Sequence, residues 1–293
     1  MSFLQLKITL SLQDVEKISE MLEENGALSL TYMDAQDQPI YEPPLNNTSP
    51  LWDNVTLLAL FDEKKDLHRV ISTLSLNESS CIIEKIKDQA WERVCVDQFK
   101  PMKFGKHLWI IPSWHIDESF PENAIKVILD PGLAFGTGSH PTTKLCLSWL
   151  AENQESLAGK FLIDYGCGSG ILGISALKLG AKIVIGIDID SQARLASMQN
   201  AQLNSVPFHV LTKTELELDK NDKADMIIAN ILAGPLVQLI DVFFDLLKVN
   251  GKLVISGILQ EQCEMLIEQY QSKFKFDSQI VEDGWARIVL TRQ

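Results

Sequence analysis

Apolar and polar residues alternate over residues 3–10, and this period of two predicts a half-buried strand. Residues 14–24 carry apolar side chains at helical spacing, and Asn25-Gly26 can end that helix. Similar patterns predict strands at 27–33, 54–61 and 81–86 and a helix at 64–74. The resulting order, β-α-β-β-α-β, is typical of a small ferredoxin-like α+β domain.

A change of pattern separates this first domain from the rest of the chain. Residues 36–50 are rich in Pro and Asn, which predicts a loop inside the domain. Residues 91–99 predict a short helix in the connection that follows. We therefore assign the first domain to residues 1–88 and an interdomain linker to residues 89–104.

The second domain, residues 105–293, is predicted to alternate strands and helices. Two strands that frame an antiparallel hairpin, or lead into the domain, are expected at 106–112 and 124–130. Later strands are expected at 161–164, 183–188, 206–211, 225–229, 252–257, 274–281 and 285–291. Helices are expected at 141–153, 171–179, 191–203, 234–247 and 260–271. This alternation specifies an α/β fold with a doubly wound, mostly parallel sheet, and the last two strands form an antiparallel terminal hairpin.

The composition is that of a soluble two-domain protein. A length of 293 residues fits two domains, and no stretch approaches the ~18 apolar residues of a membrane span. The first residues lack a basic segment followed by an apolar block, so no secretory signal is expected. The five cysteines have no CxxC spacing and the five histidines are scattered, so neither disulfides nor a metal site is predicted. We expect a cytoplasmic monomer.

The formal net charge of −13 is concentrated in the first domain. Residues 1–88 hold 15 acidic and 7 basic residues, a balance of −8. Lys and Arg must meet a nucleic-acid backbone, so RNA or DNA is a poor partner, whereas a basic protein would be attracted. Acidity can also serve solubility alone, so the charge only favours one class of substrate over another.

The strongest chemical signal is the run Asp164-Tyr165-Gly166-Cys167-Gly168-Ser169-Gly170. An apolar strand ends at Asp164 and a helix follows the run. The glycines therefore bring backbone close to a ligand at the carboxyl edge of the sheet. The next strand ends at Asp188, 22 residues after Gly166. Its carboxylate is well placed to bind both ribose hydroxyls of an adenosine.

The same loop also satisfies the dinucleotide spacing G-x-G-x-x-G, which would make the chain a nicotinamide-dependent dehydrogenase. A packing turn without a ligand is a third interpretation. Asp164 argues against a dinucleotide, because a carboxylate suits the cationic amino group of a methionine-type ligand better than a pyrophosphate. We therefore favour S-adenosylmethionine, with Asp164, Gly166, Gly168 and Asp188 as donor contacts.

A second signal lies where the strand at 225–229 ends, at Asn230 and Ile231. An Asn side-chain oxygen, together with a backbone carbonyl, can accept hydrogen bonds from an attacking amine. Such bonds would aim the nitrogen lone pair at the sulfonium methyl, so Asn230 and Ile231 are our catalytic candidates. The alternative is that Asn230 merely caps the following helix.

A third signal is the glycine- and proline-rich segment LDPGLAFGTGSHPTT, residues 129–143. The N–H groups at the following helix start, with hydroxyls such as that of Thr143, can bind the donor's carboxylate. Phe135 would cover the donor or the substrate's alkyl chain, and Gly136 and Thr137 are further candidate donor contacts. His140 is a candidate donor contact or base, or a loop histidine that hydrogen-bonds nearby backbone.

These segments resemble the bacterial ribosomal protein L11 methyltransferase family. The similar runs are LDPGLAFGTGSHPTT, IDYGCGSGILGI, IGIDID and ANILAGPL, in this order. The resemblance implies a class I methyltransferase domain, preceded by a ferredoxin-like domain that recognises a ribosomal large-subunit protein. It also implies methylation of lysine side chains and an α-amine, with donor contacts at Thr143, Gly166, Asp188 and Asn230. Ser139 stands where other members often have Thr.

The predicted reaction is an in-line displacement of the sulfonium methyl by an amine. The donor is already activated, so the enzyme mainly supplies position and desolvation. The amine must be neutral, and a dry pocket raises the neutral fraction of a lysine. The sequence identifies no dedicated base. The remaining alternatives are an RNA methyltransferase, a dehydrogenase and a non-catalytic binding protein.

Overall fold

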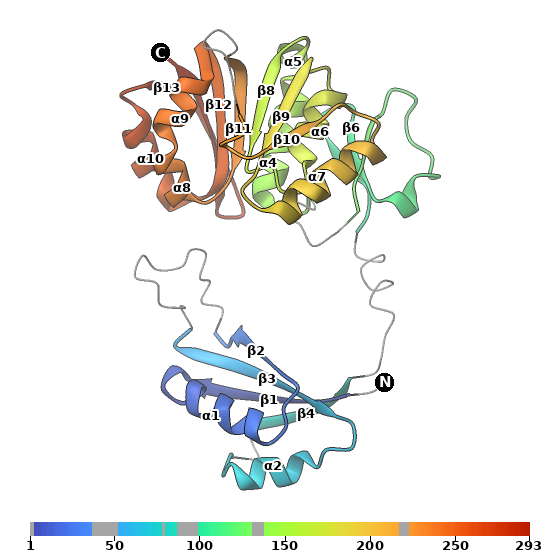
Figure 1. Cartoon of the computed structure of the whole chain (residues 1–293), viewed down its shortest axis with the longest axis vertical. Coiled ribbons are helices and arrows are strands. Elements are labelled where there is room, and N and C mark those ends of the chain that lie inside the picture. Colours follow the sequence, from blue (N-terminus) through green and yellow to red (C-terminus); the bar gives the residue numbers. More distant parts are fainter. Residues whose placement is uncertain (1–2, 37–51, 78–79, 87–98, 131–137, 217–222) are drawn as a thin grey trace. The chain divides into compact units, whose positions relative to one another are not determined.

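The computed structural model describes residues 3–36, 52–77, 80–86, 99–130, 138–216 and 223–293 (Figure 1). The chain divides into two compact units, Met1–Val94 and Cys95–Gln293. The loop predicted at 36–50 and the helix at 91–99 fall almost entirely outside the described residues, and so do Phe135, Gly136 and Thr137. No helix in the described ranges is long and apolar enough to cross a membrane.

The first unit is a four-stranded antiparallel sheet with two helices, in the strand order β2-β3-β1-β4. Its elements are β1 (Phe3–Ser11), α1 (Leu12–Glu24), β2 (Ser29–Asp34), β3 (Asn54–Asp62), α2 (Leu67–Thr73) and β4 (Cys81–Ile86). Alternate residues of the central strands, such as Leu6 and Leu57, pack with Leu22 of α1 in one buried core. The predicted ferredoxin-like arrangement is confirmed. Helix α2 begins later than predicted because Asp66 caps it.

The second unit contains a seven-stranded sheet in the order β10-β9-β8-β11-β12-β14-β13 (Figure 1). Its strands are β8 (Phe161–Tyr165), β9 (Ile183–Ile187), β10 (His209–Leu211), β11 (Ala224–Asn230), β12 (Leu247–Leu259), β13 (Phe274–Glu282) and β14 (Trp285–Arg292). The first five strands of this order are parallel, and β14 and β13 are antiparallel. The predicted doubly wound sheet with a terminal hairpin is confirmed.

Helices cover both faces of this sheet. They are α4 (Pro141–Glu152), α5 (Gln154–Leu157), α6 (Ile171–Lys178), α7 (Ser191–Leu203), α8 (Ala233–Gln238), α9 (Ile240–Leu246) and α10 (Cys263–Tyr270). Neighbouring residues of β11 point to opposite faces: Ile228 joins the core beneath α4 and α6, and Ile227 joins the core beneath α8 to α10. The interiors of the central strands are therefore mostly apolar, because both of their faces are buried.

A small three-stranded sheet precedes the large one, and of the two alternatives for its strands the antiparallel hairpin is wrong. It contains β5 (Met102–Phe104), β6 (Leu108–Ile111) and β7 (Ile125–Ile128). Strands β6 and β7 are parallel, not an antiparallel hairpin, because the long connection at 112–124 brings the chain back before β7 begins. The antiparallel partner of β6 is β5, a strand that the sequence did not predict.

Other elements differ from the predictions in their boundaries. The helix expected at 234–247 is two helices, α8 and α9, with Leu239 between them. The strand expected at 206–211 pairs only from His209, because Pro207 has no N–H for the ladder. Strand β12 is longer than expected, since it begins at Leu247, which pairs with Ala224 of β11.

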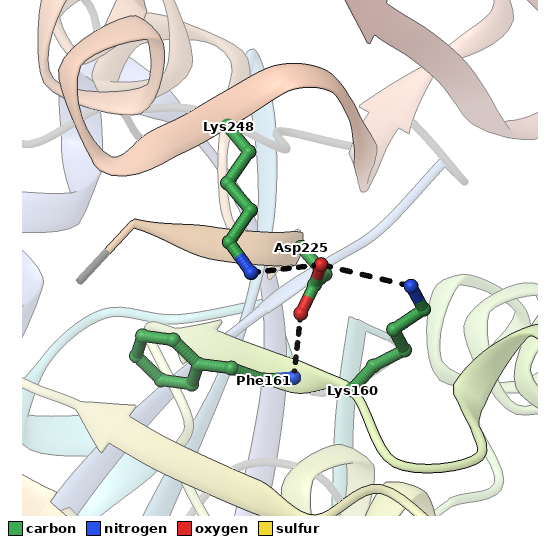
Figure 2. A network of polar contacts seen from close by, with 4 residues as sticks. All are labelled: Lys160, Phe161, Asp225 and Lys248. Atoms are coloured by element: carbon green, nitrogen blue, oxygen red, sulfur yellow. Dashed lines mark hydrogen bonds and ion pairs between the residues drawn. The ribbon is translucent and has the colours of Figure 1, made fainter. Parts of the chain in front are cut away.

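Asp225 of β11 links the amino ends of β8, β11 and β12 through hydrogen bonds and ion pairs (Figure 2). Its carboxylate accepts a hydrogen bond from the Phe161 N–H of β8 at 3.0 Å and pairs with Lys248 of β12 at 3.0 Å. Lys160 lies 3.7 Å from the same carboxylate. Burial alone would raise the pKa of Asp225, but these partners outweigh it and hold the pKa below its ordinary value. Both oxygens of this carboxylate thus have partners within the protein.

Candidate active site

The three acidic and amide residues singled out by sequence lie at one edge of the sheet. Asp164 and Asn230 belong to the carboxyl ends of β8 and β11, and Asp188 directly follows β9. The register places Asp164 between Gly186 of β9 and Ile228 of β11. Parallel strands end at a common edge, so the alternation of strands and helices brings these side chains to the same crevice.

The loop between β8 and α6 needs its glycines. Gly166, Gly168 and Gly170 all have positive φ angles, of 75°, 55° and 79°. A side chain would be strained in this conformation. At Gly166 a Cβ would also collide with the side chain of Ile231. The loop can therefore follow this path only with glycine at these positions.

Asp188 holds this loop in place. One carboxylate oxygen accepts a hydrogen bond from the Gly168 N–H at 2.9 Å, and the other accepts one from the Asp190 N–H at 3.0 Å. A carboxylate has about four lone-pair sites, so both oxygens can still accept bonds from hydroxyl groups. The side chain is partly exposed. The following residue, Ile189, is 92% exposed, an unusual position for an apolar side chain.

Asp164 is buried, and only one of its oxygens is used. Oδ2 accepts a hydrogen bond from the Gly173 N–H of α6 at 2.8 Å. Oδ1 has no hydrogen-bond partner among the described residues. Burial raises the pKa of Asp164 to about 7, with a smaller contribution from the charge of Asp188, and the bond from Gly173 opposes this rise. A cationic group at Oδ1 would favour the ionised carboxylate.

Asn230 also has an unused oxygen. Its Nδ2 donates to Thr143 Oγ1 at 3.3 Å, which joins β11 to the first turn of α4. Its Oδ1 is buried and has no partner within the described part of the chain. The capping alternative is wrong, because Leu232 occupies the N-cap position of α8. Asn230 therefore presents a free acceptor beside the glycine loop.

Ile231, the residue after Asn230, contacts the glycine loop through its side chain and β12 through its backbone. The side chain covers Gly166, and the N–H donates to the Ser256 carbonyl of β12 at 3.1 Å. Gly257, with a φ of 84°, lies against the Ile231 backbone, and a Cβ on Gly257 would collide with the Ile231 carbonyl oxygen. The absence of that Cβ leaves the carbonyl oxygen uncovered on this side.

His140 caps α4. Its Nδ1 accepts from the Thr142 N–H at 3.4 Å and lies 2.8 Å from the Thr142 hydroxyl. Its ring packs edge-on against Trp285 with a centroid distance of 4.8 Å. Burial, with the charge of Lys144, lowers the pKa of His140. The bond to nearby backbone that sequence suggested is present, and a contact of His140 with the donor stays a prediction.

Sequence reasoning missed the side chains that support the glycine loop from α7. Ser197 and Asn200 donate hydrogen bonds to the carbonyls of Gly168 and Ser169 at 2.7 and 2.8 Å. The signal was present, since polar residues recur at helical spacing on the face of α7 that also carries alanines. It was ambiguous, because polar residues on a helix ordinarily face solvent.

The geometry brings together two sets of predicted residues. Asp164, Gly166, Gly168 and Asp188 form one wall, and Thr143, Asn230 and Ile231 form the other. The two buried oxygens without described partners, on Asp164 and Asn230, are acceptors. They fit a ligand that carries amine donors and an adenosine, and S-adenosylmethionine has both.

The strand order, the glycine loop after β8 and the carboxylate after β9 define a class I S-adenosylmethionine-dependent methyltransferase. The family model described as ribosomal protein L11 methyltransferase matches residues 2–293, and the chain belongs to that family. A relative of this name from Histophilus somni is 50% identical and covers 98% of this chain and 97% of its own length. One from Pseudomonas putida is 48% identical, with 98% of both chains covered.

A solved structure agrees with the family assignment. The crystal structure of ribosomal protein L11 methylase from Lactobacillus delbrueckii subsp. bulgaricus is 32% identical, with a TM-score of 0.60. The similarity covers 67% of this chain and 100% of that chain. The protein is thus a methyltransferase that uses S-adenosylmethionine as its methyl donor, and the dehydrogenase alternative is wrong.

Proposed function

We propose that the protein transfers methyl groups from S-adenosylmethionine to amines of ribosomal protein L11, at lysine side chains and the α-amino terminus. The observation that carries this proposal is the free oxygen of Asn230 beside the glycine loop. It is supported by relatives about 50% identical that are named for this substrate. A cytoplasmic monomer is the form in which we expect the enzyme to act.

The donor is held by residues from two segments of the second unit. The Asp188 carboxylate binds the ribose hydroxyls, and the backbone of Gly166 and Gly168 lies against the adenosine. Ile189 covers the base, which explains its exposure. The free oxygen of Asp164 pairs with the donor's amino group, and the start of α4 at Thr143 binds its carboxylate. Phe135, Gly136, Thr137 and His140 are further donor contacts in this proposal.

The substrate amine is held by two acceptors. The Oδ1 of Asn230 and the backbone carbonyl of Ile231 accept hydrogen bonds from its N–H groups, which points the nitrogen lone pair at the methyl group. Gly257 keeps the second acceptor open. Once bound, the donor supplies an activated methyl group, and the chain supplies orientation and a dry site that favours the neutral amine. The amine's proton leaves to solvent.

The first domain recognises the protein substrate. Residues 1–88 carry the −8 balance, and a basic ribosomal protein is attracted to such a surface. In this proposal residues 89–104 link it to a catalytic domain at 105–293. Deleting residues 1–88 should leave donor binding intact and abolish methylation of L11. Full activity of the truncated enzyme would refute the recognition role.

Mass spectrometry of purified L11 tests the proposed function. L11 incubated with the enzyme and S-adenosylmethionine should gain methyl groups on lysine side chains and on its amino terminus. The matched control is L11 incubated with the Asn230→Ala enzyme. Unmodified L11 would contradict the proposal. Labelling of a ribosomal extract that nuclease treatment abolishes would instead support the RNA methyltransferase alternative.

A further inference from the structure

Helix α7 and its C-cap residue Asn204 are bonded to two different segments, the glycine loop and β7. Ser197, Asn200 and Asn204 make these bonds, and Ser197 and Asn204 are fully or almost fully buried. Burying an amide requires partners for both of its ends. The partners of these side chains therefore show which parts of the fold depend on α7.

The first segment is the glycine loop. Ser197 Oγ donates to the Gly168 carbonyl at 2.7 Å, and Asn200 Nδ2 donates to the Ser169 carbonyl at 2.8 Å. The loop also packs closely on the helix, since a Cβ on Gly170 would lie 3.0 Å from Ser197 Oγ. Two consecutive carbonyls of the loop are thus fixed to α7, while Asp188 binds the Gly168 N–H.

The second segment is the end of β7. Asn204 Oδ1 accepts from the Ile128 N–H at 2.7 Å, and Asn204 Nδ2 donates to the Ile128 carbonyl at 2.7 Å. The same Nδ2 also donates to the Asn200 carbonyl at 2.8 Å. The other edge of β7 pairs with β6, so Asn204 occupies the place of a neighbouring strand at Ile128. One side chain thereby satisfies both backbone groups of a strand residue.

The three-stranded sheet in turn supports the start of α4. Helix α4 packs on β5, and Gly138, just before this helix, lies against Met102 of β5. A Cβ on Gly138 would be 2.9 Å from the Met102 methyl and 3.1 Å from Ile171 of α6. A connected set of packed contacts therefore runs from Asn204 through the small sheet to the turn that carries Thr143.

We propose that Asn204 is a positioning residue that sets the distance between the two halves of the donor site. This inference rests on the proposed donor contacts. The glycine loop holds the adenosine half, and the start of α4 holds the carboxylate of the methionine half. Helix α7 is bonded to the first half by Ser197 and Asn200, and Asn204 links it to the second through β7 and the small sheet. Loss of Asn204 therefore affects ligands that span both halves more than ligands that fill one.

Two ligands distinguish this role from a general loosening of the site. S-adenosylhomocysteine spans both halves, and adenosine fills only the first. In Asn204→Leu, which keeps the side-chain size and removes both bonds to Ile128, the affinity for S-adenosylhomocysteine should fall roughly tenfold. The affinity for adenosine should change less than twofold. In Ser197→Ala both affinities should fall together, because the glycine loop itself loses support.

Calorimetric titration of the full-length variants with both ligands is the test. Gln202→Ala, an exposed residue of the same helix, is the matched control and should bind both ligands as the unaltered enzyme does. Unchanged S-adenosylhomocysteine affinity in folded Asn204→Leu would overturn the proposal. So would an equal loss for both ligands, which indicates loosening of the glycine loop.

A second variant covers the case in which Asn204→Leu does not fold. Asn204→Asp keeps the acceptor for the Ile128 N–H and loses the donor to its carbonyl, so the same selective loss should follow. The proposal would be overturned if Asn204→Asp bound S-adenosylhomocysteine and adenosine with the same affinities as the unaltered enzyme. An error in the proposed donor site would give a different result. In that case Asp188→Ala would bind adenosine as tightly as the unaltered enzyme.

Discussion

The two ends of the large sheet each carry a carboxylate, and the protein's own groups satisfy one of them far more fully than the other. At the amino end, Asp225 accepts a hydrogen bond from the Phe161 N–H and forms ion pairs with two lysines, and its pKa lies below the ordinary value (Figure 2). At the carboxyl end, Asp164 is buried and accepts a hydrogen bond from one N–H. Its other oxygen has no described partner, and burial raises its pKa to about 7.

The difference separates residues that stabilise the fold from residues that await a ligand. Burial raises the pKa of both carboxyls, and at Asp225 the protein's own groups outweigh the effect. At Asp164, and at the Asn230 oxygen nearby, the described residues leave the acceptor unsatisfied. A buried acceptor without a partner destabilises the free protein, so a bound donor and substrate are the natural groups to satisfy it.

The largest effect is expected at Asn230. Asn230→Ala removes the acceptor for the substrate amine, so kcat should fall on the order of a hundredfold, as when one group that orients a transition state is lost. Donor affinity should change far less. Thr143→Val is the comparison: it removes the partner of Nδ2 and the proposed contact with the donor's carboxylate but keeps Asn230 Oδ1, so at saturating donor it should reduce kcat less. Equal kcat in Asn230→Ala and the unaltered enzyme would contradict the proposed role.

A smaller effect is expected at Asp188. Asp188→Ala removes the ribose contact and the support of the Gly168 N–H. The free energy of donor binding should weaken by about 1.5–3 kcal/mol, the range for hydrogen bonds to a charged group. Isothermal titration with S-adenosylhomocysteine measures this loss. Unchanged affinity would mean that the donor lies elsewhere.

Donor affinity should also depend on pH through Asp164. The cationic amino group of the donor binds the ionised carboxylate, which forms as the pH rises through about 7. Affinity for S-adenosylhomocysteine should therefore increase roughly tenfold between about pH 5.5 and about pH 7, below the range in which an α-amine loses its proton near ~8. In Asp164→Asn this increase should vanish. An equally steep increase in that variant would assign the dependence to another group.

The sign is opposite for the stability of the donor-free enzyme. The pKa of Asp164 is raised in the folded state, so its contribution to stability is present at low pH and is lost as the pH rises through about 7. As the pH rises from the ordinary pKa of 3.8 to about 7, the Tm of the donor-free enzyme should fall more than the Tm of donor-free Asp164→Asn. Thermal unfolding with and without S-adenosylhomocysteine measures both effects.

The smallest functional effect is expected at the amino end of the sheet. Asp225→Asn weakens the ion pairs with Lys160 and Lys248 and should lower the free energy of unfolding by about 1 kcal/mol. Donor affinity and kcat should stay unchanged, because the site lies at the opposite ends of the strands. A loss of donor affinity with no loss of stability in Asp225→Asn would contradict the assignment of the amino end of the sheet to stability and the carboxyl end to ligand binding.

The positions of Asp164, Asp188 and Asn230 could be predicted because they depend on local patterns. Each stands where an apolar strand ends, and parallel strands bring their carboxyl ends to one edge. The identity of the loop as a methyl-donor site also followed from neighbours in sequence. These features need no knowledge of contacts between distant segments.

Contacts between distant segments could not be predicted. The bonds of Asn204 to Ile128 join residues 76 positions apart, and no local pattern encodes them. The parallel pairing of β6 and β7 depends on how the connection between them folds, which hydrophobic periodicity does not reveal. Likewise, Gly173 and Gly186 look like ordinary helix and strand residues until the Phe208 ring is seen to fill the space beside both.

The central claim is that the free oxygen of Asn230 receives the substrate amine. A crystal structure of the enzyme with S-adenosylhomocysteine and an L11 peptide tests it most directly. The account predicts a lysine or α-amine nitrogen within hydrogen-bond distance of Asn230 Oδ1, facing the donor's sulfur, with Asp188 on the ribose hydroxyls. An amine held by other groups, with Asn230 Oδ1 still unpartnered, would contradict it.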